Sequence, residues 1–193
     1  MVKKKSKTAN KSPKSPSKNS QSPKIKAVFS GDKVISNSSA AVQLCNQSRF
    51  GEIIDGKVSY SLVEAFYLMK KAKMEVSLKG KKLSAESFFK EASKLDHNLS
   101  NRYSVFSDLR NRGYLVKTAL KFGADFRVYD RGVKPGDDHA KWVLYPVHEA
   151  SSFTWYDFSA KNRVAHSTRK NLLLGIVDDE GDVTFYEVKW TRP

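Results

Sequence analysis

The C-terminal stretch LLLGIVDDEGDVTFYEVKW, residues 172–190, decides the kind of fold that this chain can form. Residues 172–177 are apolar without interruption, which is typical of a strand that is buried on both faces. Residues 184–190 alternate between apolar and polar side chains, which is typical of a strand with one face in solvent. The acidic turn at 178–182 joins the two strands into a hairpin. This combination predicts a mixed sheet in the C-terminal part of the chain.

Three further strand-like runs precede this hairpin, at 114–120, 125–129 and 141–147. Turns rich in Gly, Pro and Asp separate these runs, as is usual between short strands. A strongly polar segment at 155–165 has the pattern of a helix that lies between two strands. These elements form a predicted C-terminal domain at residues 100–193.

The preceding part of the chain, residues 27–99, predicts a helix-rich domain with a short sheet. Ser61 and Glu64 have the Ser-x-x-Glu spacing of a capping box, which starts a helix. The predicted elements are strands at 27–29 and 33–35 around the turn Gly31-Asp32, a helix at 61–73, a strand at 74–78, a turn at Gly80, a helix at 84–95 with Phe88, Ala92 and Leu95 on one face, and a helix at 99–112 that stops before Gly113. The predicted fold class is therefore α+β, with this small N-terminal domain followed by the mixed-sheet α/β domain.

The chain is strongly basic, with a formal net charge of +15 and an isoelectric point near 9.8. Residues 1–26 carry nine lysines and no acid, so subtracting nine from +15 leaves +6 for the rest. Their Ser-Pro pairs and near lack of apolar side chains predict a disordered basic tail. A basic chain favours a polyanionic partner, and nucleic acid is the first candidate. The tail itself is either a flexible phosphate-binding arm or a dispensable extension.

Composition also limits the compartment and the metal chemistry. The single cysteine, Cys45, excludes an intramolecular disulfide and a zinc site built from several cysteines, and packing is its ordinary role. No stretch reaches the ~18 apolar residues of a membrane-spanning helix, and the N-terminal segment lacks the apolar core of a signal peptide. These features predict a cytoplasmic protein without a membrane contact.

Polar side chains gather at the predicted strand ends of the C-terminal domain. The set consists of Arg127, Tyr129, Asp130, Arg131, Asp137, Asp138, His139, Arg163, His166, Arg169 and Lys170. Catalytic groups collect at such positions because the sheet fixes them while the loops leave them reachable. Taken singly, each has an ordinary role: Tyr129 as a strand tyrosine, His139 as a surface histidine and Lys170 as a solvated lysine.

Three blocks in this region have a specific order and spacing. They are KFGADFRVYDRG at 121–132, Asp138-His139 with the histidine ten residues after Tyr129, and RVAHSTRK at 163–170, in which Lys170 falls 31 residues after His139. Upstream, SLVEA at 61–65 and DLRNRGY at 108–114 extend the pattern. Together these motifs resemble the archaeal tRNA-splicing endonuclease (tRNA-intron endonuclease) family from about residue 27 to the C-terminus. Ordered blocks with matching spacing are much more specific than one short motif.

The resemblance implies a metal-independent catalytic triad of Tyr129, His139 and Lys170. In this triad the tyrosine accepts the proton of the attacking ribose 2'-hydroxyl, the histidine protonates the departing 5'-oxygen, and the lysine holds the charged phosphorane. Attack by an internal hydroxyl is intramolecular, so the protein needs to supply only geometry, proton transfer and charge stabilisation. The neighbours Asp137 and Asp138 would favour the protonated imidazole. The products would carry 2',3'-cyclic phosphate and 5'-hydroxyl ends, and no cofactor is implied.

The implied substrate is precursor tRNA with a bulge-helix-bulge motif, cut at both intron boundaries. Arg163 falls where the family keeps an arginine that stacks on a bulge base. For a second stacking residue the C-terminal strand offers Lys189, Trp190 and Arg192 without a unique match. Lys189 and Trp190 are further RNA-binding candidates, and packing at a subunit interface is the alternative for Trp190.

The resemblance also implies an oligomer, because two bulges need two active sites at a fixed distance. We expect a homotetramer, with a heterotetramer containing a second subunit type as the alternative. The terminal strand at 183–190 offers an edge for a twofold contact. The acidic turn, with Asp178, Asp179, Glu180 and Asp182, is expected to contact a basic pocket on a partner subunit, and a solvated turn is its alternative.

Two rival functions stay open at this point. A non-catalytic structural or RNA-binding subunit of the same assembly typically lacks triad residues, whereas this chain has all three. A metal-dependent DNA nuclease is the second rival, since the C-terminal sheet resembles restriction-endonuclease-like domains. Such an enzyme needs converging carboxylates, for which Asp125 and Asp130 or the acidic turn are the candidates. We expect no metal site.

Overall fold

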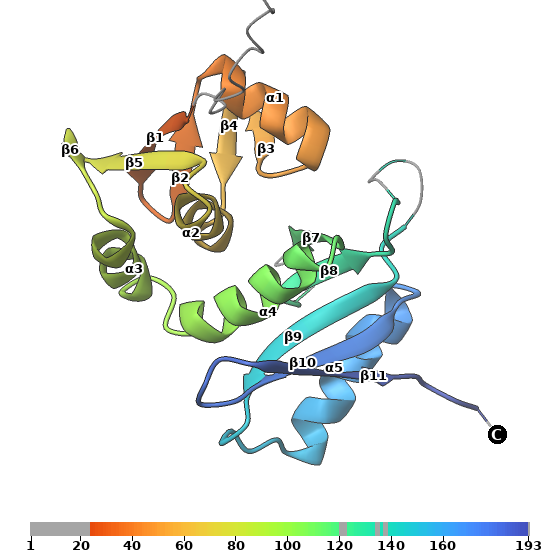
Figure 1. The fold of residues 1–193 in the computed structure, drawn as a ribbon. Helices are drawn as coiled ribbons and strands as arrows, with labels where there is room; N and C mark the ends of the chain where they lie inside the picture. The colour runs from red at the N-terminus through yellow and green to blue at the C-terminus, as the bar shows by residue number, and fades with distance from the viewer. Residues whose placement is uncertain (1–23, 120–122, 134–135, 137–138, 193) are drawn as a thin grey trace, which may run out of the picture.

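The computed structural model describes residues 24–119, 123–133, 136 and 139–192 (Figure 1). Within these ranges the chain forms two sheets, of six and five strands, and five helices. The predicted basic tail lies outside the described residues up to residue 23. None of the helices in the described part of the chain has the length and apolar character that crossing a membrane requires.

The N-terminal sheet has the strand order β3-β4-β2-β1-β5-β6. Its strands are β1 (Ile25–Ser30), β2 (Lys33–Ser36), β3 (Glu52–Ile54), β4 (Lys57–Tyr60), β5 (Met74–Leu78) and β6 (Lys81–Lys82), and its helices are α1 (Ser39–Ser48), α2 (Leu62–Lys70) and α3 (Ala85–Ser93). β1 pairs antiparallel with β2 and parallel with β5. The predicted hairpin around Gly31-Asp32 and the predicted strand at 74–78 are confirmed.

Part of this half differs from the prediction. β1 begins at Ile25, which is buried, so residues 25 and 26 belong to the strand and not to the basic tail. Neither α1 nor the β3–β4 hairpin was predicted. α1 buries only Ala41 and Cys45, and the two strands of the hairpin are three and four residues long, so the local apolar signal is weak. A contact from a later segment helps to hold them: the Gly51 amide donates to Glu64 Oε1 at 3.0 Å.

Two of the predicted helices are found with corrected ends. At the start of α2, Ser61 accepts a hydrogen bond from the Glu64 amide and the Glu64 carboxylate accepts one from the Ser61 amide, as the capping box predicts. α2 ends at Lys70, three residues early, and Ala72 adopts a left-handed φ of 54°. α3 buries Phe88 and Ala92, but the prediction for Leu95 is wrong, since this side chain is 56% exposed. The reason is that α3 ends at Ser93, so Leu95 no longer follows the helical face.

The C-terminal sheet has the strand order β11-β10-β9-β8-β7. Its strands are β7 (Leu115–Thr118), β8 (Phe126–Tyr129), β9 (Trp142–His148), β10 (Asn171–Val177) and β11 (Val183–Val188). β9 and β10 are parallel, and the other neighbouring pairs are antiparallel. The mixed sheet and the fold class predicted from the sequence are therefore confirmed.

A helix covers each face of this sheet, as Figure 1 shows for α4 (Leu99–Asn111) and α5 (Trp155–Ser167). The Phe106 ring of α4 lies 5.8 Å from the Phe126 ring on one face. Ala165 of α5 packs with Leu172 on the other face. The sheet is thus fixed from both sides, and its strand ends and connections lie at the borders of the two covering helices.

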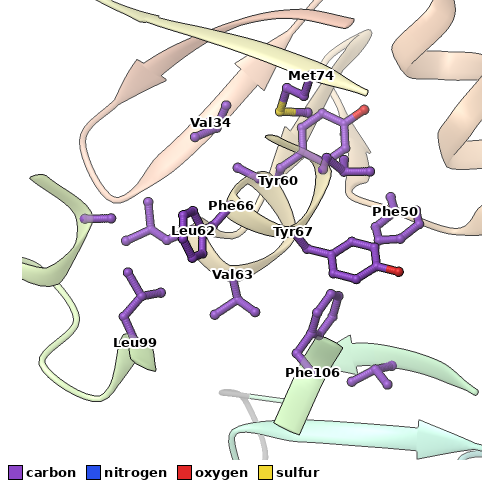
Figure 2. Packing of buried hydrophobic residues seen from close by; sticks show 14 of the residues in the cluster. Val34, Phe50, Tyr60, Leu62, Val63, Phe66, Tyr67, Met74, Leu99 and Phe106 are labelled. Atoms are coloured by element: carbon purple, nitrogen blue, oxygen red, sulfur yellow. The ribbon is translucent and has the colours of Figure 1, made fainter. Parts of the chain in front are cut away.

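One continuous apolar core joins the two halves through α4. Figure 2 shows Phe106 of α4 beside Tyr67 of α2, with ring centroids 5.6 Å apart. Phe50 packs against both rings, at 5.7 Å from Tyr67 and 6.4 Å from Phe106. Arg110, near the end of α4, donates to the Ser48 carbonyl at 2.8 Å. The N-terminal half therefore supports the sheet that carries the candidate site.

Candidate active site

The three predicted catalytic residues lie on three segments of the C-terminal sheet. Tyr129 is the last residue of β8, His139 belongs to the connection between β8 and β9, and Lys170 immediately precedes β10. Each position is a strand end or a connection, where the packed scaffold fixes the backbone and the side chain can meet a ligand.

Backbone hydrogen bonds align these segments at one end of the sheet. The Lys141 amide donates to the Val128 carbonyl at 2.9 Å, and the Asn171 amide donates to the Lys141 carbonyl at 3.0 Å. The end of β8 and the start of β10 therefore flank the start of β9. Since neighbouring strands are ~4.8 Å apart, the backbones at Tyr129 and Lys170 are ~10 Å apart.

Lys170 has a partly buried and electropositive environment. Its Nζ donates to the Thr168 carbonyl at 2.8 Å. Burial, followed by the positive charge of Arg127, lowers the pKa of Lys170 below its usual value. Arg127 is two residues before Tyr129 on β8, so both side chains belong to the same face of that strand. Arg127 therefore acts electrostatically on Lys170 from the face of β8 that also carries Tyr129.

Tyr129 and His139 differ sharply in exposure. Tyr129 is 4% exposed and packs against Leu115 and Ala140. His139, the residue before Ala140, is exposed. Packing therefore holds the phenol ring in place, while the imidazole of the adjacent segment faces solvent. The predicted helpers of His139, Asp137 and Asp138, lie outside the described residues.

Of the predicted RNA-binding residues, one is on α5, one contacts this helix and one lies beside the C-terminal hairpin. Arg163 is an exposed residue of this helix. Trp190 is 55% exposed, and its ring centroid is 4.6 Å from that of His166 on α5. Lys189 Nζ lies 3.5 Å from Glu187 Oε2. The structure brings Trp190 to the helix that carries Arg163, whereas Lys189 is engaged in an ion pair on the hairpin.

The four acids predicted as a subunit contact form the turn between β10 and β11. The Asp182 amide donates to Asp178 Oδ1 at 2.8 Å, which closes the turn. Asp179 Oδ1 is 3.3 Å from His148 Nε2. Asp179, Glu180 and Asp182 are exposed. This turn therefore presents negative charge to solvent on a defined backbone.

The carboxylates considered for a metal site do not converge. Asp125 and Asp130 flank opposite ends of β8. Asp125 Oδ1 lies 3.1 Å from Arg102 Nε, and Asp130 Oδ2 lies 3.3 Å from Lys141 Nζ. Each carboxylate thus serves an ion pair of its own. Across the described ranges, no group of three or more His, Cys, Asp or Glu side chains is placed to hold a metal ion.

Lys117 of β7, which the sequence motifs did not include, lies directly opposite Arg127 of β8 and is 8% exposed. Its Nζ donates to the carbonyls of Gly51 at 2.6 Å and Arg49 at 3.1 Å, and lies 3.8 Å from Glu64 Oε1. The sequence feature that could have identified Lys117 is its position directly after the apolar residues Leu115 and Val116 of the strand. Lys117 connects the sheet of the candidate site to the N-terminal half.

The mixed sheet, its two covering helices and the acid–base and cationic residues at its strand ends fit a nuclease of the α/β class. Comparison with protein families agrees with this class. The model described as tRNA intron endonuclease, catalytic C-terminal domain, matches residues 99–185, and the model of the N-terminal domain of the same family matches residues 25–89. The chain belongs to the tRNA intron endonuclease family, as the sequence motifs predicted.

Similar proteins cover most of the chain and carry the name tRNA-splicing endonuclease. The protein from Thermococcus onnurineus (strain NA1) is 43% identical over 169 residues, which are 87% of this chain and 97% of that protein. The protein from Nanoarchaeum equitans (strain Kin4-M) is 50% identical over 147 residues, 73% of this chain and 94% of that protein. The protein from Methanothermobacter thermautotrophicus is 39% identical over 165 residues, 84% and 96% of the two chains. These relatives support a tRNA-splicing endonuclease function for this chain.

Proposed function

We propose that this protein cuts precursor tRNA at both intron boundaries within a bulge-helix-bulge motif, without a metal ion. The reaction leaves a 2',3'-cyclic phosphate on one product and a 5'-hydroxyl on the other. The observation that carries the proposal is the alignment of the segments of Tyr129, His139 and Lys170 at one end of the C-terminal sheet. Family membership supports the substrate class.

The proposed roles follow from the chemistry of the three side chains. Tyr129, as phenolate, takes the proton of the ribose 2'-hydroxyl, whose oxygen forms the new bond to phosphorus. The bond from phosphorus to the 5'-oxygen breaks, and His139 gives its proton to that oxygen. The ammonium of Lys170 stabilises the additional negative charge on the phosphorane.

The spacing of the strands supports these roles. The ~10 Å between the backbones at Tyr129 and Lys170 leaves room for a phosphate group between a phenol and a lysine side chain that share one sheet face. The exposed position of His139 on the adjoining segment is suited to a group that must reach the departing oxygen. The rigid packing of Tyr129 against Leu115 and Ala140 orients the base.

The purified full chain should cut a bulge-helix-bulge RNA twice, and excess EDTA should leave the rate unchanged. Analysis of the ends should find cyclic phosphate and 5'-hydroxyl groups. Cleavage that stops in EDTA, or that leaves 5'-phosphate ends, would falsify this mechanism. The alternative, a non-catalytic structural or RNA-binding subunit of the same assembly, predicts tight RNA binding with no cleavage at any protein concentration.

The proposed enzyme is a homotetramer, and the charges of the fold support this assembly. A cleft of about 300 Å³ between the two halves is lined by Arg49, Lys73 and Arg110. Among the described residues, its lining includes no acid, and the acidic turn at 178–182 does not line the cleft of its own chain. The negative charge of the turn is therefore complementary to the positive charge of this cleft on a second copy of the chain. β11 is an edge strand of its sheet, so it can pair with β11 of a second copy across a twofold axis.

Neutralising the exposed acids of the turn should split this assembly. In the double variant Asp179→Asn/Glu180→Gln, the charge match to the cleft is lost, while Asp178 and Asp182 still close the turn. Light scattering should give about four protomer masses of 21.8 kDa for the wild type and about two for the variant. The control Glu86→Gln/Glu91→Gln on α3 should stay tetrameric. A variant that keeps the wild-type mass contradicts the proposed contact, and a wild type that assembles only with another chain supports the heterotetramer.

A further inference from the structure

Three aromatic side chains lie exposed where β9 leads into α5. Trp155 is 83% exposed, Tyr156 is 76% exposed and Phe153 is 39% exposed. Trp155 and Tyr156 are the first two residues of α5. Large aromatic rings that are this exposed and adjacent mark an interaction surface, because single scattered apolar residues are the usual situation on a protein surface.

The local structure holds these rings in place. Thr154 caps α5 by accepting a hydrogen bond from the Asp157 amide at 3.1 Å. The Trp155 ring meets the Phe158 ring edge to face, with centroids 5.8 Å apart and an interplanar angle of 86°. Lys161 Nζ lies 5.5 Å from the Phe153 ring centroid. The cap and the Phe158 contact thus restrain the Trp155 ring before any ligand arrives, which lowers the entropic cost of binding.

The aromatic surface is followed by a basic segment, with Lys161 and Arg163 on α5 and Arg169 and Lys170 just after its end. Tyr156 and the exposed Arg163 are seven residues apart, which places them on one face of α5 with a separation of ~10.5 Å along the axis. Residues 155–170 contain the cations Lys161, Arg163, Arg169 and Lys170 and the single acid Asp157. The helix thus runs from an aromatic start to a basic end beside Lys170.

We propose that Trp155 and Tyr156 form a stacking platform for unpaired nucleotides of the RNA substrate, distinct from the residues that act at the scissile phosphate. The inference rests on the proposed function and names a further contact of the same substrate. Bases stack on exposed aromatic rings without a strong sequence requirement, while neighbouring cations bind the backbone. The ~10.5 Å between Tyr156 and Arg163 equals about three base steps of 3.4 Å, so one strand can contact both.

The positive charge of this basic segment favours RNA over a protein partner. The basic side chains continue from the aromatic surface to the candidate active site, as a phosphate backbone requires. The acidic turn at 178–182 has a basic cleft elsewhere as its counterpart. A protein interface at this surface is the competing explanation, and the test below separates the two.

The test measures the binding of a bulge-helix-bulge RNA whose two attacking 2'-hydroxyls are replaced by hydrogen. Under the proposed chemistry this RNA binds and is not cut, so fluorescence anisotropy gives a Kd. The double variant Trp155→Ala/Tyr156→Ala should raise the Kd at least about tenfold, equivalent to ~1.4 kcal/mol. The variant Trp155→Phe/Tyr156→Phe keeps two stacking rings and should stay within about threefold of the wild type.

The matched control is Ile53→Ala/Ile54→Ala, which removes two exposed apolar side chains of the N-terminal sheet that are 50% and 46% exposed. It should leave the Kd unchanged. The proposal is overturned if the alanine variant at 155 and 156 binds like the wild type, or if its weaker binding comes with a smaller assembly in light scattering. Failure of the proposed function has a different signature: the wild type then fails to cut unmodified RNA, or cuts the 2'-deoxy RNA.

Discussion

Replacing His139 by alanine should slow RNA cleavage by at least ~100-fold, the low end of the contribution of a general acid. The 5'-oxygen is a poor leaving group without a proton, and His139 is an exposed acid–base group on the segment between Tyr129 and β9. The rate should be measured in single turnover with saturating enzyme, so that substrate binding and product release do not enter. His97→Ala, a change of another exposed histidine, should retain the wild-type rate.

A modified substrate makes the role of His139 specific. A sulfur atom in place of the departing 5'-oxygen leaves without protonation, so this RNA should be cut by His139→Ala almost as fast as by the wild type. Tyr129→Phe should stay slow on the same RNA, because its defect is in removing the 2'-hydroxyl proton. A full rate for His139→Ala on ordinary RNA, or no recovery on the sulfur substrate, would remove His139 from the role of acid.

Replacing Lys117 by methionine should lower the free energy of unfolding by about 3–5 kcal/mol, the usual effect of removing one partner from a buried charged network. Lys117 Nζ donates to the Gly51 and Arg49 carbonyls and lies 3.8 Å from the Glu64 carboxylate. Methionine fills a similar volume but leaves the buried Glu64 carboxylate without its cation and takes the lysine donor away from the Gly51 and Arg49 carbonyls. The contact between the two halves of the chain should weaken first.

Urea unfolding at one fixed protein concentration measures this effect, since oligomer stability depends on concentration. Lys57→Met, which changes an exposed lysine of β4, is the control and should alter the free energy by at most ~0.5 kcal/mol. Adding Glu64→Gln to Lys117→Met should cost less than the sum of the two single changes, because the two groups interact. A loss below ~1 kcal/mol for Lys117→Met would show that the contact is not important for stability.

The sequence alone was sufficient for the elements with strong local signals. The capping box of Ser61 and Glu64 started α2 at the right residue. The apolar run and alternating run of the C-terminal hairpin gave β10 and β11, and the strand at 125–129 gave β8. The spaced motifs around Tyr129, His139 and Lys170 identified the family, because these motifs are read along the chain without reference to its folding.

Only the tertiary structure decided features that depend on contacts between distant segments. α1 buries only two residues and the strands β3 and β4 are short, and the segment between them is held by a distant partner, Glu64, which accepts from the Gly51 amide. A lysine at position 117 of a buried strand has no explanation in the sequence alone. The structure explains it, because Lys117 Nζ donates to the carbonyl of Gly51, 66 positions away. Likewise, the exposure of Trp155 is a property of the packed surface, because the same sequence would equally suit a buried ring. Local propensity and motif spacing can be determined from the sequence, whereas burial and the pairing of charges arise only when the folded chain brings remote residues together.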